Sequence, residues 1–85
     1  MFYYVYVLQS KFDRNFYTGA TENLKERIKD HNYGRVKSTK ERRPLKLVYF
    51  EGCFSKKDAT KRERYLKTSW GKRYIKNRIK NYLKI

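Results

Sequence analysis

The sequence predicts an α+β fold: a small, mainly antiparallel sheet of three strands flanked by helices, in the order β-β-α-β-α-α. Two observations support it. The first 21 residues hold two runs rich in aromatic and β-branched residues, separated by a polar turn. The apolar spacing then changes to helical steps of three and four, and one further strand-like run interrupts it. Since 85 residues are enough for one modest core, we expect a single domain over residues 1–85.

The first two strands are expected over about Phe2–Gln9 and Asn15–Thr21. The polar segment between them contains turn-forming residues, which predicts an antiparallel hairpin. Side chains alternate across a strand, so Tyr4 and Tyr6 share one face. A phenol has an apolar body and a polar tip, and it can reach from a core into a cleft. We therefore interpret the hairpin as the floor of a candidate site.

A helix is expected after the hairpin, with Thr21 as its N-cap. Leu24, Ile28 and His31 follow at steps of four and three, which places them on one helical face. Arg27 lies four residues before His31, so these two side chains are neighbours on the helix surface.

A basic loop over residues 35–43 follows the first helix, and it is either solvated or in contact with phosphate. The next run, Leu45–Phe54, predicts the third strand. Ser55 is suited to cap a second helix. That helix carries a stripe at steps of four, three and four, formed by Ala59, Glu63, Leu66 and Trp70.

The end of the chain predicts a third helix from about Lys72 to Leu83, after Gly71 breaks the pattern of the second. Its apolar side chains would face inward and its lysines and arginines outward. We expect Trp70 to be a core anchor rather than a platform on which a base stacks.

The charge of the chain is strongly positive, with 23 Lys plus Arg against 8 Asp plus Glu and a formal net charge of +15. A polyanion is therefore the first partner to expect, because neutralised phosphates release counterions. No apolar run approaches the ~20 residues that span a bilayer, and the N-terminal run does not read as a signal peptide. The single cysteine, Cys53, excludes an intramolecular disulfide and a cysteine-rich zinc site. We expect a cytoplasmic protein with no membrane partner.

Glu63 is the most informative residue, because an unpaired carboxylate on a core-facing stripe costs free energy unless something compensates it. One interpretation is an ion pair with one of the many arginines. The other is a divalent metal, since Mg²⁺ takes only one or two protein carboxylates and fills its other positions with water and phosphate.

The other polar candidates have simple structural interpretations when each is taken alone. Tyr6 and Tyr17 are good strand formers, and Gly19 can be a bulge or a strand end. His31 can pack on the core at the end of its helix, and Arg27 can be a solvated surface charge.

Taken together and in order, these residues resemble the GIY-YIG nuclease family. Tyr4-Val5-Tyr6 and, ten residues later, Tyr17-Thr18-Gly19 stand where the family has Gly-Ile-Tyr and Tyr-Ile-Gly. Both tyrosines and the second glycine are kept. The resemblance spans about residues 3–70 and looks closest to the small stand-alone, single-domain bacterial branch. The series continues through Thr21, Leu24, Arg27, His31, Asn32, Gly34, Lys37-Ser38-Thr39, Arg43-Pro44, Leu47-Val48-Tyr49 and Ala59-Thr60-Lys61-Arg62-Glu63.

The resemblance implies hydrolysis of a DNA phosphodiester with one divalent metal, Mg²⁺ or Mn²⁺. Glu63 would hold the metal, and Arg27 would contact the scissile phosphate. Tyr6 or Tyr17 would take a proton from the attacking water. His31 would either stabilise the phenolate by its positive charge or accept the proton from the tyrosine. Gly19 would be structural.

The basic loop and the third helix would hold the nucleic-acid backbone. Because no recognition module is evident, we expect a structure-selective endonuclease with little sequence specificity, acting on DNA rather than RNA in DNA repair or recombination. The alternative is a non-catalytic basic nucleic-acid-binding module, and a third possibility is a ribosome-associated basic protein that prefers RNA. The expected backbone contacts in the loop are Arg35, Lys37, Thr39, Lys40, Arg42 and Arg43.

Overall fold

The computed structural model describes residues 1–84 and confirms the predicted α+β class. The short 3₁₀ helix Lys40–Arg42 lies within the basic loop. In chain order the other elements are β1 (Tyr3–Ser10), β2 (Phe16–Thr21), α1 (Leu24–Asn32), β3 (Leu45–Cys53), α2 (Lys56–Leu66), α3 (Ser69–Arg78) and α4 (Lys80–Leu83).

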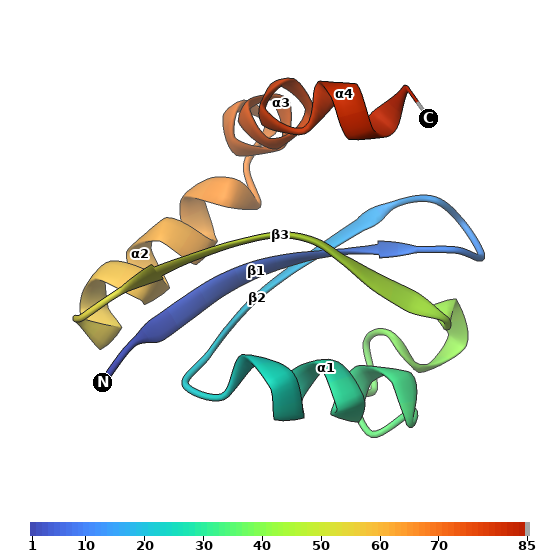
Figure 1. Ribbon diagram of the computed structural model, residues 1–85, viewed down its shortest axis with the longest axis horizontal. Coiled ribbons are helices and arrows are strands. Elements are labelled where there is room, and N and C mark those ends of the chain that lie inside the picture. Colours follow the sequence, from blue (N-terminus) through green and yellow to red (C-terminus); the bar gives the residue numbers. More distant parts are fainter. Residues whose placement is uncertain (85) are drawn as a thin grey trace.

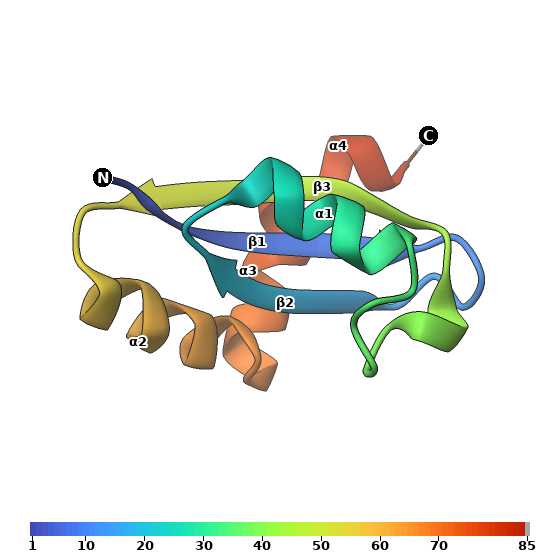
Figure 2. The same ribbon diagram turned by 90° about the horizontal axis from the view of Figure 1, so that it is seen from below.

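The three strands form one antiparallel sheet in the order β2-β1-β3, so β1 is central and β2 is an edge strand. Helix α1 lies on one face of the sheet, while α2 and α3 lie on the other (Figure 1). Seen from below, α1 crosses in front of the strands, and α2 lies near the β2 side of the sheet (Figure 2). The edge strand β2 is thus accessible to side chains from both helical layers.

The central strand supplies both cores by simple alternation. Val5 and Val7 point toward α2 and α3, where they pack with Ala59, Leu66 and Ile75. Tyr6 and Leu8 point the other way and pack with residues of α1, β2 and β3. This alternation is the period of two that a strand imposes. It places the Tyr6 phenol on the α1 side of the sheet.

The first helix begins later than the sequence pattern predicts, because Asn23 and not Thr21 is its N-cap. The Asn23 side chain accepts a hydrogen bond from the backbone N–H of Glu26 at 3.1 Å. The Thr21 hydroxyl instead accepts from the backbone N–H of Asn23 at 3.1 Å and stabilises the turn before the helix. Both residues suit capping, and only the path of the chain decides between them.

The expected stripe on the second helix is wrong at its last member, because α2 ends at Leu66. Thr68 caps α3 by accepting from the backbone N–H of Gly71 at 3.1 Å. Gly71 is buried, and a Cβ there would overlap the backbone of Tyr65 and Leu66, so it permits close helix packing instead of ending a helix. Trp70 is 68% exposed and is not a core anchor.

No helix within residues 1–84 is long and apolar enough to cross a membrane.

Candidate active site

Tyr6 lies at the centre of the candidate site because Gly19 leaves room for its ring. The two residues are directly paired across β1 and β2. A Cβ at position 19 would overlap the Tyr6 hydroxyl and the adjacent ring carbon. The ring therefore lies over the backbone of β2 and carries its hydroxyl toward the edge of the sheet. Tyr6 is only 1% exposed.

The Tyr6 hydroxyl belongs to a chain of hydrogen bonds between α1 and the following loop. Arg27 Nε donates to it at 3.4 Å, and His31 Nε2 lies 2.8 Å from it. On the other side of the imidazole, His31 Nδ1 lies 2.7 Å from the Thr39 hydroxyl. Thr39 in turn donates to the carbonyl of Val36 at 3.4 Å.

We infer the direction of this chain from the contact between the Thr39 hydroxyl and the Val36 carbonyl, because distances between heavy atoms do not by themselves place the protons. A hydroxyl has one proton to give, so the Thr39 oxygen accepts from His31 Nδ1–H. The Nε2 atom of that neutral imidazole is then an acceptor, and it receives the Tyr6 O–H. Each hydroxyl donates once and accepts once, with Arg27 at the start. Tyr6 is therefore aligned to give its proton to His31.

Burial and charge keep both members of the central pair neutral near pH 7. Burial, together with the positive charge of Arg27, lowers the pKa of His31 to about 4. Burial also raises the pKa of Tyr6 above its ordinary value. The hydrogen bond and the charge of Arg27 oppose that increase, while the negative charge of Glu63, and that of Tyr17 when it is ionised, add to it.

Tyr17 lies beside this pair on β2 and is partly exposed. Its ring centroid is 5.0 Å from that of His31, edge to face, and 6.5 Å from that of Tyr6, with the planes tilted. Its hydroxyl has no hydrogen-bond partner within residues 1–84, in contrast to that of Tyr6. The hairpin and α1 thus bring Tyr6, Tyr17, Arg27 and His31 together.

Glu63 enters the site from α2, on the outer side of β2. It lines a pocket against the end of that strand, and its side chain is 23% exposed. Its negative charge makes the smallest of the contributions that raise the pKa of Tyr6. The ion pair expected with an arginine is instead made with Lys67, whose Nζ is 2.9 Å from Glu63 Oε2. The other residues lining the pocket are Tyr3, Ala20, Thr21, Glu22, Lys56, Ala59 and Thr60.

This pocket fits a hard divalent cation with few protein ligands. Residues 1–84 contain no group of three His, Cys, Asp or Glu side chains, which a fully protein-bound metal would need. Mg²⁺ needs only one or two carboxylates when water and phosphate complete its shell. The Glu63 carboxylate is partly open to solvent and can supply that contact.

The contact expected between Thr39 and nucleic acid is wrong, because Thr39 is fully buried and its hydroxyl binds His31. Sequence reasoning missed this partnership. The signal available was the single histidine itself, since a buried imidazole needs a partner for each ring nitrogen.

Two of the arginines in the loop form ion pairs with nearby carboxylates. Arg42 pairs with Asp13 of the hairpin turn at 2.8 Å, and Arg35 pairs with Asp30 at 3.1 Å. The remaining three cationic side chains expected to contact nucleic acid lie exposed, and these are Lys37, Lys40 and Arg43.

Comparison with known proteins identifies the family of the chain. The model of the GIY-YIG catalytic domain matches residues 2–77. A UPF0213 protein of Clostridium perfringens is 52% identical over 65 residues, covering 75% of this chain and 69% of its own. A UPF0213 protein of Staphylococcus haemolyticus is 48% identical over 67 residues, covering 78% and 80%.

A solved structure gives the same result for the fold. The solution NMR structure of a UPF0213 protein from Bacillus halodurans has a TM-score of 0.55 and 36% identity, covering 88% of this chain and 82% of that one. The UPF0213 names carry no activity of their own. Because the family model covers most of the chain and the relatives are this similar, the chain belongs to the GIY-YIG family of nucleases.

Proposed function

We propose that this protein is a metal-dependent endonuclease that hydrolyses DNA phosphodiester bonds, selects DNA by structure more than by sequence, and acts in DNA repair or recombination. One observation carries the proposal: a directed hydrogen-bond chain from Arg27 through Tyr6 to His31 lies at the sheet edge where Glu63 opens into a pocket. Such a chain has no evident use in a protein that only binds nucleic acid.

Glu63 would hold Mg²⁺ or Mn²⁺ in this proposal. When bound, the metal would act as a Lewis acid that stabilises negative charge developing on the phosphate oxygens. The positive charge would also attract the carboxylate away from Lys67. That lysine would then be free to contact a phosphate of the substrate.

Tyr6 would act as a proton relay rather than as a stored phenolate. A phenol whose pKa lies above its ordinary value is a poor base at pH 7 by itself. As the new O–P bond forms and the bond from phosphorus to the leaving sugar oxygen breaks, the water proton would pass to Tyr6 while the Tyr6 proton passes to His31 Nε2. The leaving oxygen would take a proton from solvent. After both transfers along the relay, His31 carries one additional proton and Tyr6 is again a neutral phenol. The hydrogen bond of 2.8 Å supports this transfer.

Arg27 and Tyr17 would position the reacting groups. Arg27 uses Nε to donate to Tyr6, which leaves the four N–H donors of its terminal nitrogens for a phosphate. Tyr17 would hold the attacking water through its hydroxyl, next to the relay. Phosphate contacts of this kind do not read sequence, which agrees with the low sequence specificity proposed.

The ion pair between Glu63 and Lys67 favours a second candidate, a non-catalytic basic module that binds nucleic acid. In that case Lys67 permanently neutralises the carboxylate. The net charge of +15 would then account for binding. The two candidates differ in one respect that is easy to measure, which is cleavage in the presence of a divalent metal.

The test is a cleavage assay with end-labelled single-stranded, duplex and branched DNA, and RNA of the same sequence, in Mg²⁺, Mn²⁺ or EDTA. We expect cleavage of DNA only with metal, fastest on the branched substrate. Tyr6→Phe removes the relay and should lower the rate by about 10²–10⁴-fold. Tyr33→Phe, at a tyrosine that is 65% exposed, is the matched control. Binding without cleavage by the wild type under every condition would establish the second candidate instead.

A further inference from the structure

Three neighbouring pockets follow the outer edge of β2 from Glu63 to the hairpin turn. The first lies against Ala20 and Thr21, and Glu63 lines it. The second lies against Tyr17 and Thr18 and is lined by Lys67, the ion-pair partner of Glu63. The third lies against residues 13–16 and shares Phe16 and Lys72 with the second. The second and third pockets thus share residues, and the Glu63–Lys67 ion pair lies between the first and the second. We call this succession of pockets the track.

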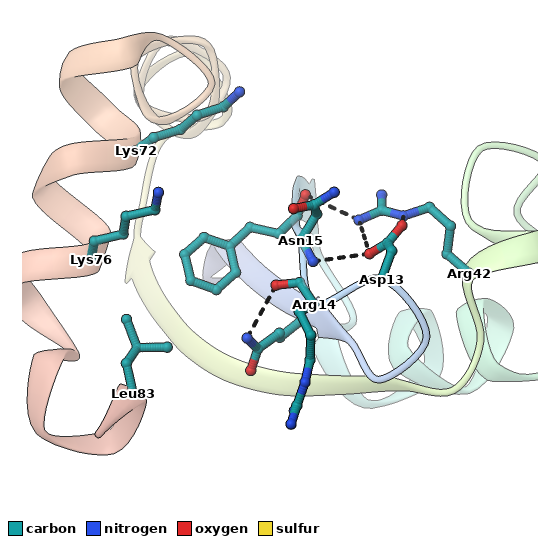
Figure 3. Close-up of a pocket in the computed structure, with 9 residues that line it drawn as sticks. Asp13, Arg14, Asn15, Arg42, Lys72, Lys76 and Leu83 are labelled. Carbon is teal, nitrogen blue, oxygen red and sulfur yellow. Dashed lines mark hydrogen bonds and ion pairs between the residues drawn. The ribbon is translucent and has the colours of Figure 1, made fainter. Parts of the chain in front are cut away.

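The charge along this track is positive beyond Glu63. Lys67 lies in the middle, and Lys72 and Lys76 line the far end. Figure 3 shows both of these lysines extending from α3 toward the hairpin turn that carries Arg14. Within residues 1–84, no carboxylate lies within ion-pair distance of Lys72 or Lys76.

The opposite wall of the third pocket adds a further free cation. Arg42 lines it together with Asp13, and these two neutralise each other at 2.8 Å. Arg14 lines the same wall and has no carboxylate partner among the described residues. The far end of the track therefore presents Lys72 and Lys76, both unpaired in the described part of the chain, while the Arg14 side chain extends away from them (Figure 3).

The length of the track matches about two nucleotides. Phe16 and Ala20 are four residues apart on a strand, which corresponds to about 13 Å at ~3.3 Å per residue. Neighbouring phosphates of one DNA strand rise by about 3.4 Å along the helix axis, but the backbone winds around that axis, so their separation is about 6–7 Å. The lysines of α3 therefore lie roughly two nucleotides from the phosphate that would contact Glu63.

We propose that the DNA backbone follows this track, and that Lys72 and Lys76 bind phosphates about two nucleotides from the scissile one. The inference rests on the proposed function for the position of the scissile phosphate, and it adds where the flanking DNA lies. It also moves the main backbone contact away from the loop over residues 35–43, whose Thr39 is buried and whose Arg35 and Arg42 are paired.

The test compares two double variants that remove the same charge from different places. The double variant Lys72→Ala, Lys76→Ala removes both lysine charges from the far end of the track. Lys25→Ala with Lys29→Ala removes two exposed lysines, also four apart, from α1. Lys25 lines a pocket with Leu47 of β3, away from β2. A general effect of net charge would be the same for both pairs.

Binding is measured by fluorescence anisotropy with a labelled duplex in EDTA, so that no cleavage occurs, over about 50–200 mM salt. Each lost phosphate contact lowers the slope of log K against log salt by about 0.9. We expect a decrease of about 1.8 for the Lys72 and Lys76 pair. The wild-type affinity should therefore fall about twelvefold more than that of this variant over that fourfold range of salt. The Lys25 and Lys29 pair should keep the wild-type slope.

The outcomes separate this inference from the proposed activity. Equal slopes for the two double variants would overturn the track, even if the wild type cleaves DNA. The salt slope could decrease only for the Lys72 and Lys76 pair while the wild type cleaves no DNA under any condition. That result would support the track and reject the nuclease. If the wild type cleaves DNA, the double variant Lys72→Ala, Lys76→Ala should have a higher KM and a kcat near the wild-type value.

Discussion

Thr39 gives the sharpest test of the hydrogen-bond chain, because its hydroxyl defines which nitrogen of His31 carries the proton. Replacing Thr39 by Val keeps the shape of the side chain and removes only that hydroxyl. The His31 Nδ1–H, buried and 2.7 Å from the lost oxygen, would have no partner. The imidazole would then gain by moving its proton to Nε2, which opposes donation from Tyr6.

The expected cost follows from the burial of both groups. Leaving a buried donor unsatisfied costs about 1–3 kcal/mol, whereas a hydroxyl with access to solvent contributes less. Thr60→Val on α2 is the matched control, because its hydroxyl donates to the backbone carbonyl of Lys56 in an exposed environment. We expect Thr39→Val to lower the free energy of unfolding by about 1–3 kcal/mol and Thr60→Val by less than about 0.5 kcal/mol.

Urea unfolding measures the stability, and ¹⁵N NMR of the imidazole measures the tautomer. The chain has one histidine, so the spectrum reports on His31 alone. The wild type should show a neutral ring protonated at Nδ1 at pH 7. Thr39→Val should shift the population toward Nε2–H. If the wild type is protonated at Nε2, or if Thr39→Val changes neither stability nor tautomer, the direction inferred for the chain is wrong.

Three further predictions concern the packing and charge around the site. The pKa of His31 is about 4 in the fold against an ordinary 6.5, so the unfolded chain binds the proton first as pH falls. The free energy of unfolding should decrease by at most about 3 kcal/mol between pH 6.5 and 4, and a flat profile in urea titrations would refute this. Gly19→Ala should displace the Tyr6 ring and lower the thermal midpoint, at a cost of about 1–3 kcal/mol, and an unchanged midpoint would contradict the overlap. Glu51→Gln should destabilise by about 1–2 kcal/mol in calorimetry, because it weakens the pair with Arg62 at 2.6 Å in a partly buried position; no change would mean that the pair is only a surface contact.

The hairpin could be predicted because its signals are local. The alternation of β1 places Tyr6 and its neighbours without reference to the rest of the chain, and the strand limits differ from the predicted ones by at most one residue. The ends of the helices are harder to predict from the sequence than the hairpin. The spacing that leads from Leu66 to Trp70 continues across a real break, and only the Thr68 cap and the buried Gly71 reveal that a new helix begins.

The partners within the site could not be predicted from spacing, because they come from irregular chain. Thr39 lies in a loop whose composition suggests solvent or phosphate, yet the loop folds back and buries it against His31. The ion pair of Lys67 could not be predicted either. The position of Lys67 one turn after Glu63 is visible in the sequence, but whether the pair forms depends on how far the carboxylate is exposed. In both cases tertiary packing decides the role.

The most direct measurement of the central claim is single-turnover cleavage across a metal titration, with the DNA that the wild type cuts fastest. Glu63→Gln is compared with Glu41→Gln, an exposed glutamate in the 3₁₀ helix. Since metal stabilisation of the transition state is worth several kcal/mol, Glu63→Gln should be slower by about 100-fold or more at every Mg²⁺ or Mn²⁺ concentration. Glu41→Gln should match the wild type. Equal rates for all three proteins, or cleavage that persists in EDTA, would contradict a metal-dependent nuclease centred on Glu63.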